Sequence, residues 1–267
     1  MRKYIHVNNL RTYGRAPFNI ALVHGGPGAP GEMAPVAREL ASEMGVLEPL
    51  QTAGSIDGQV EELKNVLETH GNPPLILVGF SWGAWLSFIL AAQYPSLVKK
   101  LILVSSPPFT EKYAAQIMET RLNHLNSDEK QESISLLSSI YSGSARGNSF
   151  ARFGDLMDKA DSFAPLHHDD EILPCSPVIY QQVWAEAGKI RSSGELLQFG
   201  EKIQSPVVAV HGDYDPHPAA GIQEPLSRAL KDFRFILLAN CGHHPWFERE
   251  AKDSFYAALR REIGAHE

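Results

Sequence analysis

Short apolar runs alternate with longer amphipathic stretches along most of this chain. The runs have the length of β-strands and few polar positions, which is typical of strands buried on both faces of a parallel sheet. Stretches with helical periodicity lie between them; Val60, Leu63 and Val66, for example, share one face of a predicted helix. This alternation predicts an α/β fold, with a mostly parallel central sheet and helices on both faces. The predicted strands are residues 19–23, 46–48, 75–78, 98–104, 206–210 and 233–238, with possible edge strands at 4–7 and 10–13. The predicted helices are residues 33–44, 60–70, 84–92, 219–230 and 248–263.

The alternation stops after Pro107. The following block has helical stretches and loops but no convincing strand. One helix is predicted to begin near Ser127 and another at Ser176, whose hydroxyl can cap a helix with Pro177 at its first position. We interpret the block as a helical cap (lid) over the carboxyl ends of the strands, where open α/β sheets bind ligands. The predicted organisation is a first part of the core over residues 1–109, the cap over 110–200 and the second part of the core over 201–267.

The run at 75–78 leads directly into the sequence Gly-Phe-Ser-Trp-Gly at Gly79–Gly83, and a helical stretch follows. A serine at the apex of a sharp turn between a strand and a helix describes a nucleophile elbow. The two glycines leave room for strand and helix to approach closely, and the serine backbone is expected to be strained. The alternative is an ordinary Gly/Ser turn. The flanking strand and helix favour Ser81 as a nucleophile.

A serine hydroxyl needs a base within hydrogen-bond reach, and the base needs a carboxylate to orient it. Two acids, Asp213 and Asp215, follow the predicted strand at 206–210, and His243 follows the last one. The loop after the strand at 98–104 offers no acid. The residues therefore predict a triad of Ser81, His243 and one of the two aspartates.

A glycine-rich loop, His-Gly-Gly-Pro-Gly at residues 24–28, follows the first buried strand. Together with Ser81-Trp82-Gly83 it resembles the prolyl iminopeptidase-like branch of the α/β-hydrolase superfamily. That family has the same loop and the elbow Gly-Gly-Ser-Trp-Gly. The resemblance implies an α/β-hydrolase fold and favours Asp215 as the acid, because Gly212 to Asp215 match the superfamily's Gly-x-x-Asp pattern. It also favours His243 over His244, through the Gly-His pattern at Gly242.

The oxyanion hole is expected to consist of two backbone N–H groups, one from Trp82 and one from Gly26 in the glycine loop. The other interpretations of that loop are a simple connector or a phosphate cradle, but no lysine of the P-loop type follows it. The stretch Asp-Gln-Arg-Gly-x-Gly-x-Ser of prolyl iminopeptidases is absent. The corresponding residues 48–55 contain neither the arginine nor Gly-x-Gly.

Candidate residues for the substrate pocket lie in the predicted cap. Trp184 and Glu186 are candidates to line it, although a helix packing face explains the tryptophan equally well. A peptidase that recognises a free amino group needs an acid there, for which Glu171, Glu186 and Glu195 are candidates.

A metal centre is the competing interpretation of the loop after residue 210. His211, Asp213, Asp215 and His217 alternate as ligands on a strand do, and their side chains suit a metal. Glycine and prolines among them make continued strand geometry improbable. We therefore expect no metal and no cofactor.

Composition narrows the possible partners. The formal charge of −7 argues against a nucleic-acid binder, which needs a cationic face. The sequence contains no run of 18 apolar residues that could form a membrane-spanning helix, and residues 1–9 lack the apolar core of a signal peptide. Cys175 and Cys241 have no metal or redox spacing. The expectation is a reduced, cytoplasmic protein whose partner is a small-molecule or short-peptide substrate.

The predicted function is that of a metal-independent serine hydrolase, which forms an acyl-enzyme on Ser81 and cleaves a small ester or amide. An aminopeptidase of the prolyl iminopeptidase type is the alternative within this class. A non-catalytic small-ligand receptor on the same fold is an alternative from another class, and a lyase is a third, because fold does not determine reaction.

Overall fold

The computed structural model describes residues 9–27, 30–142, 148–167, 173 and 176–264. Within them the central sheet has seven strands in the order β1-β3-β2-β4-β5-β6-β7. β1 pairs antiparallel with β3, and all other neighbours pair in parallel, which confirms the predicted mostly parallel sheet. The possible edge strand at residues 4–7 lies outside the described residues. The strands are β1 Leu10–Tyr13, β2 Phe18–Val23, β3 Gly45–Pro49, β4 Leu75–Phe80, β5 Val98–Val104, β6 Val207–Gly212 and β7 Phe233–Leu238.

β4 lies in the middle of the sheet, and every one of its residues is buried. A strand covered on both faces has no solvated side, which explains its continuous apolar sequence. On the neighbouring strand β5 the charged residue Lys100 is also buried, and its ammonium donates hydrogen bonds to the Glu262 carboxylate (2.7 Å) and backbone carbonyl (2.8 Å). A buried charge is tolerated there because a partner of opposite charge compensates it.

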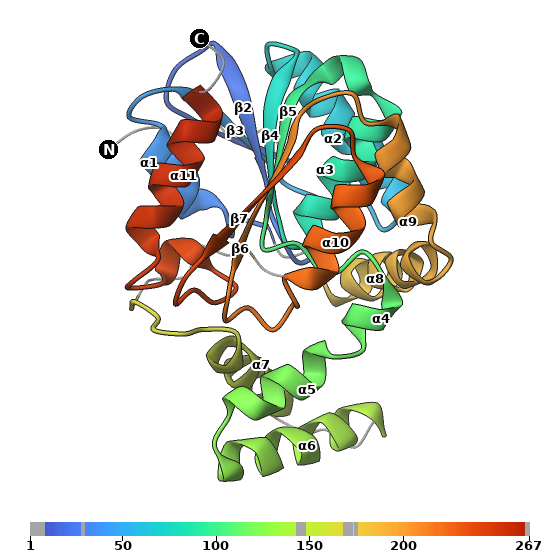
Figure 1. Ribbon diagram of the computed structural model, residues 1–267, viewed down its shortest axis with the longest axis vertical. Coiled ribbons are helices and arrows are strands. Elements are labelled where there is room, and N and C mark those ends of the chain that lie inside the picture. The colour runs from blue at the N-terminus through green and yellow to red at the C-terminus, as the bar shows by residue number, and fades with distance from the viewer. Residues whose placement is uncertain (1–8, 28–29, 143–147, 168–172, 174–175, 265–267) are drawn as a thin grey trace.

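Helices cover both faces of the sheet (Figure 1). On one face lie α2 (Ile56–His70), α3 (Trp82–Gln93) and α10 (Ala220–Ala229). On the other lie α1 (Ala34–Leu40) and α11 (Lys252–Gly264). Each face encloses its own hydrophobic core, so the sheet separates two apolar layers. Among the described residues, each helix is too short or too polar to cross a lipid bilayer.

α2 and α11 each begin four residues away from the start that the hydrophobic pattern predicts. α2 begins at Ile56 rather than at residue 60, because the Ser55 hydroxyl caps it by accepting from the Gly58 backbone N–H at 3.1 Å. α11 begins at Lys252 rather than at residue 248, after a short 3-10 turn η3 (Pro245–Phe247).

In its described part, the block between β5 and β6 consists of helices joined by loops, and its one β-type contact is an isolated bridge between Pro165 and Glu248. The helices α5, α6 and α7 project from the main body on the side where β5 ends (Figure 1), around a small core of their own. α8 instead packs beside α2, and Ser176 and Pro177 start it as predicted. The division into core and cap at residues 110 and 200 stays a prediction. The elements of the block are α4 Glu111–Ala114, α5 Ile117–His124, α6 Ser127–Tyr141, α7 Ser149–Ala160, α8 Pro177–Ser192, α9 Glu195–Gln198 and the 3-10 turn η2 Phe199–Lys202.

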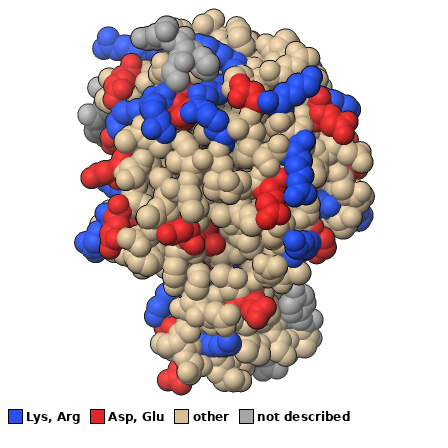
Figure 2. Space-filling view, in the orientation of Figure 1, with Lys and Arg blue, Asp and Glu red and all other residues tan. Residues whose placement is uncertain are grey.

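Figure 2, in the same orientation, shows the lobe formed by α5, α6 and α7 below the main body of the molecule. On the face in view, acidic and basic side chains are interspersed, and many of them gather on the upper part. This surface carries charges of both signs rather than one continuous basic field.

Candidate active site

Ser81 stands at the turn between β4 and α3 with φ 50° and ψ −119°, a backbone conformation that non-glycine residues rarely adopt. Such strain costs about 1–3 kcal/mol and persists only where the surroundings enforce it. Here the Ser81 N–H donates to the Val104 carbonyl at 3.0 Å, and the Ser81 carbonyl accepts from the Ala84 N–H at 2.9 Å. The serine therefore sits at a strained, locked turn.

The glycines of the elbow are required by close backbone contacts. A Cβ on Gly79 would lie 2.2 Å from the Gly83 carbonyl oxygen, and a Cβ on Gly83 would lie 2.2 Å from the Val23 carbonyl oxygen. Any side chain at either position would push β2, β4 and α3 apart. The Gly-x-Ser-x-Gly spacing thus follows from the packing of these three elements.

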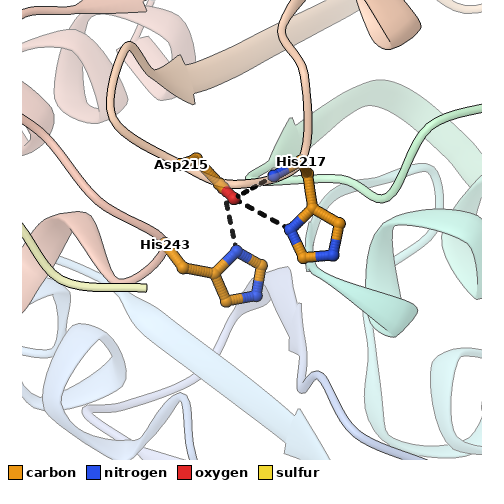
Figure 3. Close-up of side chains that lie close together, drawn as sticks. All are labelled: Asp215, His217 and His243. Atoms are coloured by element: carbon orange, nitrogen blue, oxygen red, sulfur yellow. Dashed lines mark hydrogen bonds and ion pairs between the residues drawn. The ribbon is translucent and has the colours of Figure 1, made fainter. Parts of the chain in front are cut away.

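The structure brings Asp215 and His243 together from the loops after β6 and β7 (Figure 3). The His243 Nδ1–H donates to Asp215 Oδ2 at 2.8 Å, which leaves the lone pair on Nε2. Burial by itself would raise the pKa of Asp215, but the nearby imidazoles of His243, His217 and His211 outweigh it and hold the pKa well below its usual range. The carboxylate is therefore ionised and fully buried beside the imidazole.

Asp213 has a different environment. It is exposed, and its carboxylate accepts from the Cys241 backbone N–H at 3.2 Å. This bond ties the loop after β6 to the loop after β7. Of the two acids that the residues left open, Asp215 is the one that contacts the histidine.

A second imidazole, that of His217, contacts Asp215, and nothing in the sequence predicted this contact. His217 donates to Asp215 Oδ1 from Nδ1 at 2.8 Å and from its backbone N–H at 2.9 Å. His211 Nε2–H in turn donates to the His217 carbonyl at 2.7 Å. Burial lowers the pKa of both His211 and His217, although the Asp215 charge opposes it.

The alternating set from His211 to His217 does not converge as metal ligands on a strand would. His211 is bonded to a backbone carbonyl, and Asp213 faces solvent. Instead Asp215, His217 and His243 gather ligand-type atoms within 4.8 Å of one another. The sequence predicted Asp215 and His243 as partners, but it did not predict that His217 contacts the same carboxylate.

Phe80, the residue before Ser81, places the elbow close to this cluster. Its ring centroid lies 4.9 Å from that of His243, and the His243 backbone N–H is held by the Asp161 carbonyl at 2.7 Å. Within the described part of the chain, no hydrogen bond joins the Ser81 hydroxyl to His243. Catalytic hydrogen bonds of this kind commonly tighten only when substrate is bound.

The glycine loop packs against the elbow. A Cβ on Gly83 would also meet the His24 carbonyl, so the loop crosses directly over the start of α3. Gly26 has φ 31°, within the region that favours glycine. Trp82 is the first residue of α3, where a backbone N–H has no partner within the helix. Both predicted oxyanion donors therefore belong to neighbouring segments; Gly28 lies outside the described residues.

A buried histidine and an ion pair anchor the loop. His24 donates from Nδ1 to the Gly25 carbonyl at 2.7 Å and accepts on Nε2 from the Gln51 backbone N–H at 3.0 Å. Complete burial lowers its pKa to about 4, so it is neutral. Glu32 accepts from the Gly25 N–H at 3.1 Å and pairs with His244 at 3.1 Å. Through these hydrogen bonds His24 and His244 connect the glycine loop to neighbouring loops.

Glu248 is another residue that the sequence did not single out. Its carboxylate is buried and accepts from three backbone N–H groups: those of Gly242 (3.0 Å), Phe163 (2.8 Å) and Ala164 (2.7 Å). The first belongs to the loop of His243, and the other two to the segment after α7. The side chain therefore joins the helical block to the histidine loop.

The predicted pocket residues lie on α8. The Trp184 ring centroid is 5.7 Å from that of Trp82, so the tryptophan does approach the elbow. The Glu186 carboxylate accepts from the Ile56 backbone N–H at 2.8 Å, at the start of α2. Glu195 is exposed on α9, and Glu171 lies outside the described residues. The pocket assignment of Trp184 and Glu186 stays a prediction.

Residues 9–250 match the family model of the alpha/beta hydrolase fold. The chain belongs to this family, as the sequence resemblance implied. The fold class is thereby confirmed as an α/β-hydrolase fold.

Among its relatives is the proline iminopeptidase of Lactobacillus delbrueckii subsp. bulgaricus, which is 28% identical and is matched over 94% of both chains. The human monoacylglycerol lipase ABHD6 is also 28% identical, over 74% of this chain. The match spans 58% of the length of that lipase.

Solved structures show the same fold. VinJ superimposes with a TM-score of 0.70 at 17% identity, over 98% of both chains. A putative lipase from Acinetobacter baumannii AYE gives 0.65 at 18% identity, over 99% of this chain and 92% of its own. At these identities the likeness concerns the fold alone.

Proposed function

We propose that this protein is a serine hydrolase that cleaves small esters or amides through an acyl-enzyme on Ser81. The observation that carries the proposal is the 2.8 Å hydrogen bond from His243 Nδ1–H to Asp215 Oδ2. It fixes the tautomer in which Nε2 can accept a proton, on a loop beside the elbow. The strained turn at Ser81 and the family membership support the same conclusion.

The reaction follows from these roles. Ser81 Oγ attacks the substrate carbonyl while His243 Nε2 takes its proton, and Asp215 stabilises the imidazolium that forms. The backbone N–H groups of Trp82 and Gly26 would stabilise the oxyanion, each worth roughly 3–4 kcal/mol by the precedent of an oxyanion-hole donor. The imidazolium then protonates the leaving group. Water attacks the acyl-enzyme with the same base and releases Ser81.

A fluorophosphonate tests the nucleophile. We expect one covalent adduct on the peptide that contains Ser81, detected by mass spectrometry. Ser81→Ala should fold with a normal melting curve but neither label nor turn over substrate. Ser87→Ala is the matched control, because Ser87 lies buried on the helix that follows Ser81 and its hydroxyl has no hydrogen-bond partner among the described residues. Labelling that survives Ser81→Ala would disprove the assignment.

An aminopeptidase is the second candidate, and the proline iminopeptidase relative favours it through its coverage of nearly the whole chain. Such an enzyme needs a carboxylate free to bind the substrate's cationic amino terminus. Of the candidate acids in the described residues, Glu186 is engaged by Ile56 and Glu195 is exposed. This supports the esterase proposal. A non-catalytic receptor would leave Ser81 unlabelled.

The remaining expectations stay predictions. They are a cytoplasmic location, a small-molecule or short-peptide substrate, and catalysis without a metal or cofactor.

A further inference from the structure

The proposed reaction uses one imidazole on Asp215, but the structure places two there. His243 Nδ1 contacts Oδ2 and His217 Nδ1 contacts Oδ1, each at 2.8 Å. Neither contact involves the Nε2 atom of the ring. His217 has no part in the proton transfers, so its buried, carboxylate-bound position is unexplained by hydrolysis.

The two rings are arranged alike. Their centroids are 4.7 Å apart, their planes differ by 35°, and both rings project from the carboxylate with Nε2 on the far side (Figure 3). Because an ionised carboxylate only accepts hydrogen bonds, each Nδ1 carries the proton and each Nε2 the lone pair. Within the described residues, neither Nε2 has a hydrogen-bond partner.

Metal-binding histidines have this same arrangement. They almost always donate their second ring N–H to a carboxylate or carbonyl, which fixes the tautomer and makes the other nitrogen a better ligand. Asp215 accepts such a hydrogen bond from two imidazoles at once. Its negative charge would also offset part of the positive charge of a bound ion. Imidazole ligands suit zinc and copper rather than magnesium or calcium.

We propose that His217 and His243 form a site for one Zn²⁺ ion, bound through their Nε2 atoms and completed by water. Side-chain rotations need only bring both nitrogens to about 2.0–2.1 Å from the ion. The ion occupies the lone pair on His243 that would accept the serine proton. Bound zinc therefore inhibits hydrolysis, and this second part of the proposal rests on the proposed function.

Hard cations do not suit the site. Both oxygens of Asp215 already accept N–H groups from His217 and His243, so they are not available as the oxygen ligands that Mg²⁺ and Ca²⁺ need. Magnesium is thus a matched negative control for zinc.

Isothermal titration of the metal-free protein with zinc sulfate tests the site without reference to activity. We expect the wild type to bind one equivalent of zinc and no magnesium. His217→Asn should weaken zinc binding at least tenfold. Asparagine is chosen because its amide can still donate to Asp215 Oδ1 but has no nitrogen in the place of Nε2. His70→Asn, at the exposed end of α2, is the control and should bind zinc like the wild type.

Zinc should also slow phosphonate labelling of Ser81 in the wild type, and a chelator should restore it. Absence of zinc binding to the wild type, or equal binding by His217→Asn, would overturn the site. If that variant does not fold, an anomalous map of zinc-soaked wild-type crystals decides: a peak between the two Nε2 atoms supports the site and a peak elsewhere refutes it. If zinc binds but Ser81 never labels, only the proposed function fails.

Discussion

At the residue scale, two acids only two positions apart have opposite environments. Asp215 is buried against His243, whereas Asp213 faces solvent and holds a backbone N–H. The difference arises because the chain turns sharply after β6, so that alternate side chains no longer share one face. It gives a direct test of which carboxylate orients the histidine.

Asp215→Asn should lower kcat by about four orders of magnitude, because an amide there favours the wrong histidine tautomer. Asp213→Asn should have a far smaller effect, since it removes only a loop contact. Steady-state hydrolysis of an activated acyl ester measures both. If the two losses are reversed, Asp215 is not the acid.

His24 gives a prediction about pH and stability. Its pKa is about 4 in the folded protein and about 6.5 in the unfolded chain. The depressed folded value means that the unfolded state binds the extra proton first as pH falls. The stabilisation is therefore complete above about pH 6.5 and is lost progressively down to about pH 4, by roughly 3 kcal/mol in all.

Urea unfolding of the wild type and of His24→Gln between pH 4 and pH 7 measures this contribution. Glutamine retains an acceptor but has no proton to gain in this range. We expect the wild type to be more stable at pH 7 and the difference to shrink as pH falls toward 4. A difference that is constant with pH would show that His24 does not stay neutral in the fold.

At the element scale, loops rather than strands hold the site together. Glu248 is the best example, because one carboxylate receives backbone N–H groups from the histidine loop and from the segment after α7. Asp161 adds a second link, since its carbonyl holds the His243 N–H while its carboxylate binds Arg121 on α5 through two contacts of 2.6 Å. These hydrogen bonds connect the helical block to the loop that carries His243.

Glu248→Gln should destabilise the protein by about 2 kcal/mol, because the amide turns an N–H group toward backbone donors and removes charge-assisted hydrogen bonds. It should also lower kcat for ester hydrolysis, because the loop of His243 loses its anchor. Urea unfolding and steady-state kinetics check the two effects. Glu250→Gln, an exposed change two residues away, should stay within about 0.5 kcal/mol of the wild type. Equal effects of the two changes would contradict the proposed role of Glu248.

At the scale of the whole molecule, the cap is expected to decide the substrate class. An esterase needs only an apolar acyl pocket and acts on substrates with good leaving groups. An exopeptidase needs an acid that binds the amino terminus. Trp184 lies close to Trp82, the residue after the proposed nucleophile, and suits the first requirement better than the second.

We therefore expect kcat/KM for short-chain acyl esters to exceed that for prolyl and other aminoacyl arylamides. Parallel assays with p-nitrophenyl butyrate and proline p-nitroanilide, with Ser81→Ala as the blank, measure the preference. The opposite preference, abolished by Glu186→Gln or Glu195→Gln, would establish the aminopeptidase alternative.

The sequence by itself determined the sheet and the elbow. Strands such as β4 are buried on both faces, so they can be recognised in the sequence as continuous apolar runs. The elbow is local, because Gly79, Ser81 and Gly83 lie within five residues of the chain. Close backbone contacts exclude a side chain at both glycines, and this requirement is visible in the sequence as the Gly-x-Ser-x-Gly motif. The chain order of the proposed nucleophile, acid and base was likewise readable, because each follows a recognisable strand.

Only the tertiary structure decided which side chains share a contact. Glu248 and Phe163 are 85 residues apart, and no local pattern marks that pair. The family resemblance favoured Asp215 over Asp213, but only the structure shows that the Asp215 carboxylate contacts His243. His217 seemed part of an alternating set that the fold separates, yet it joins His243 on one carboxylate. Hydrophobic periodicity reflects whether each single residue is buried. A hydrogen bond between loops depends in addition on two distant segments meeting at the same edge of the sheet.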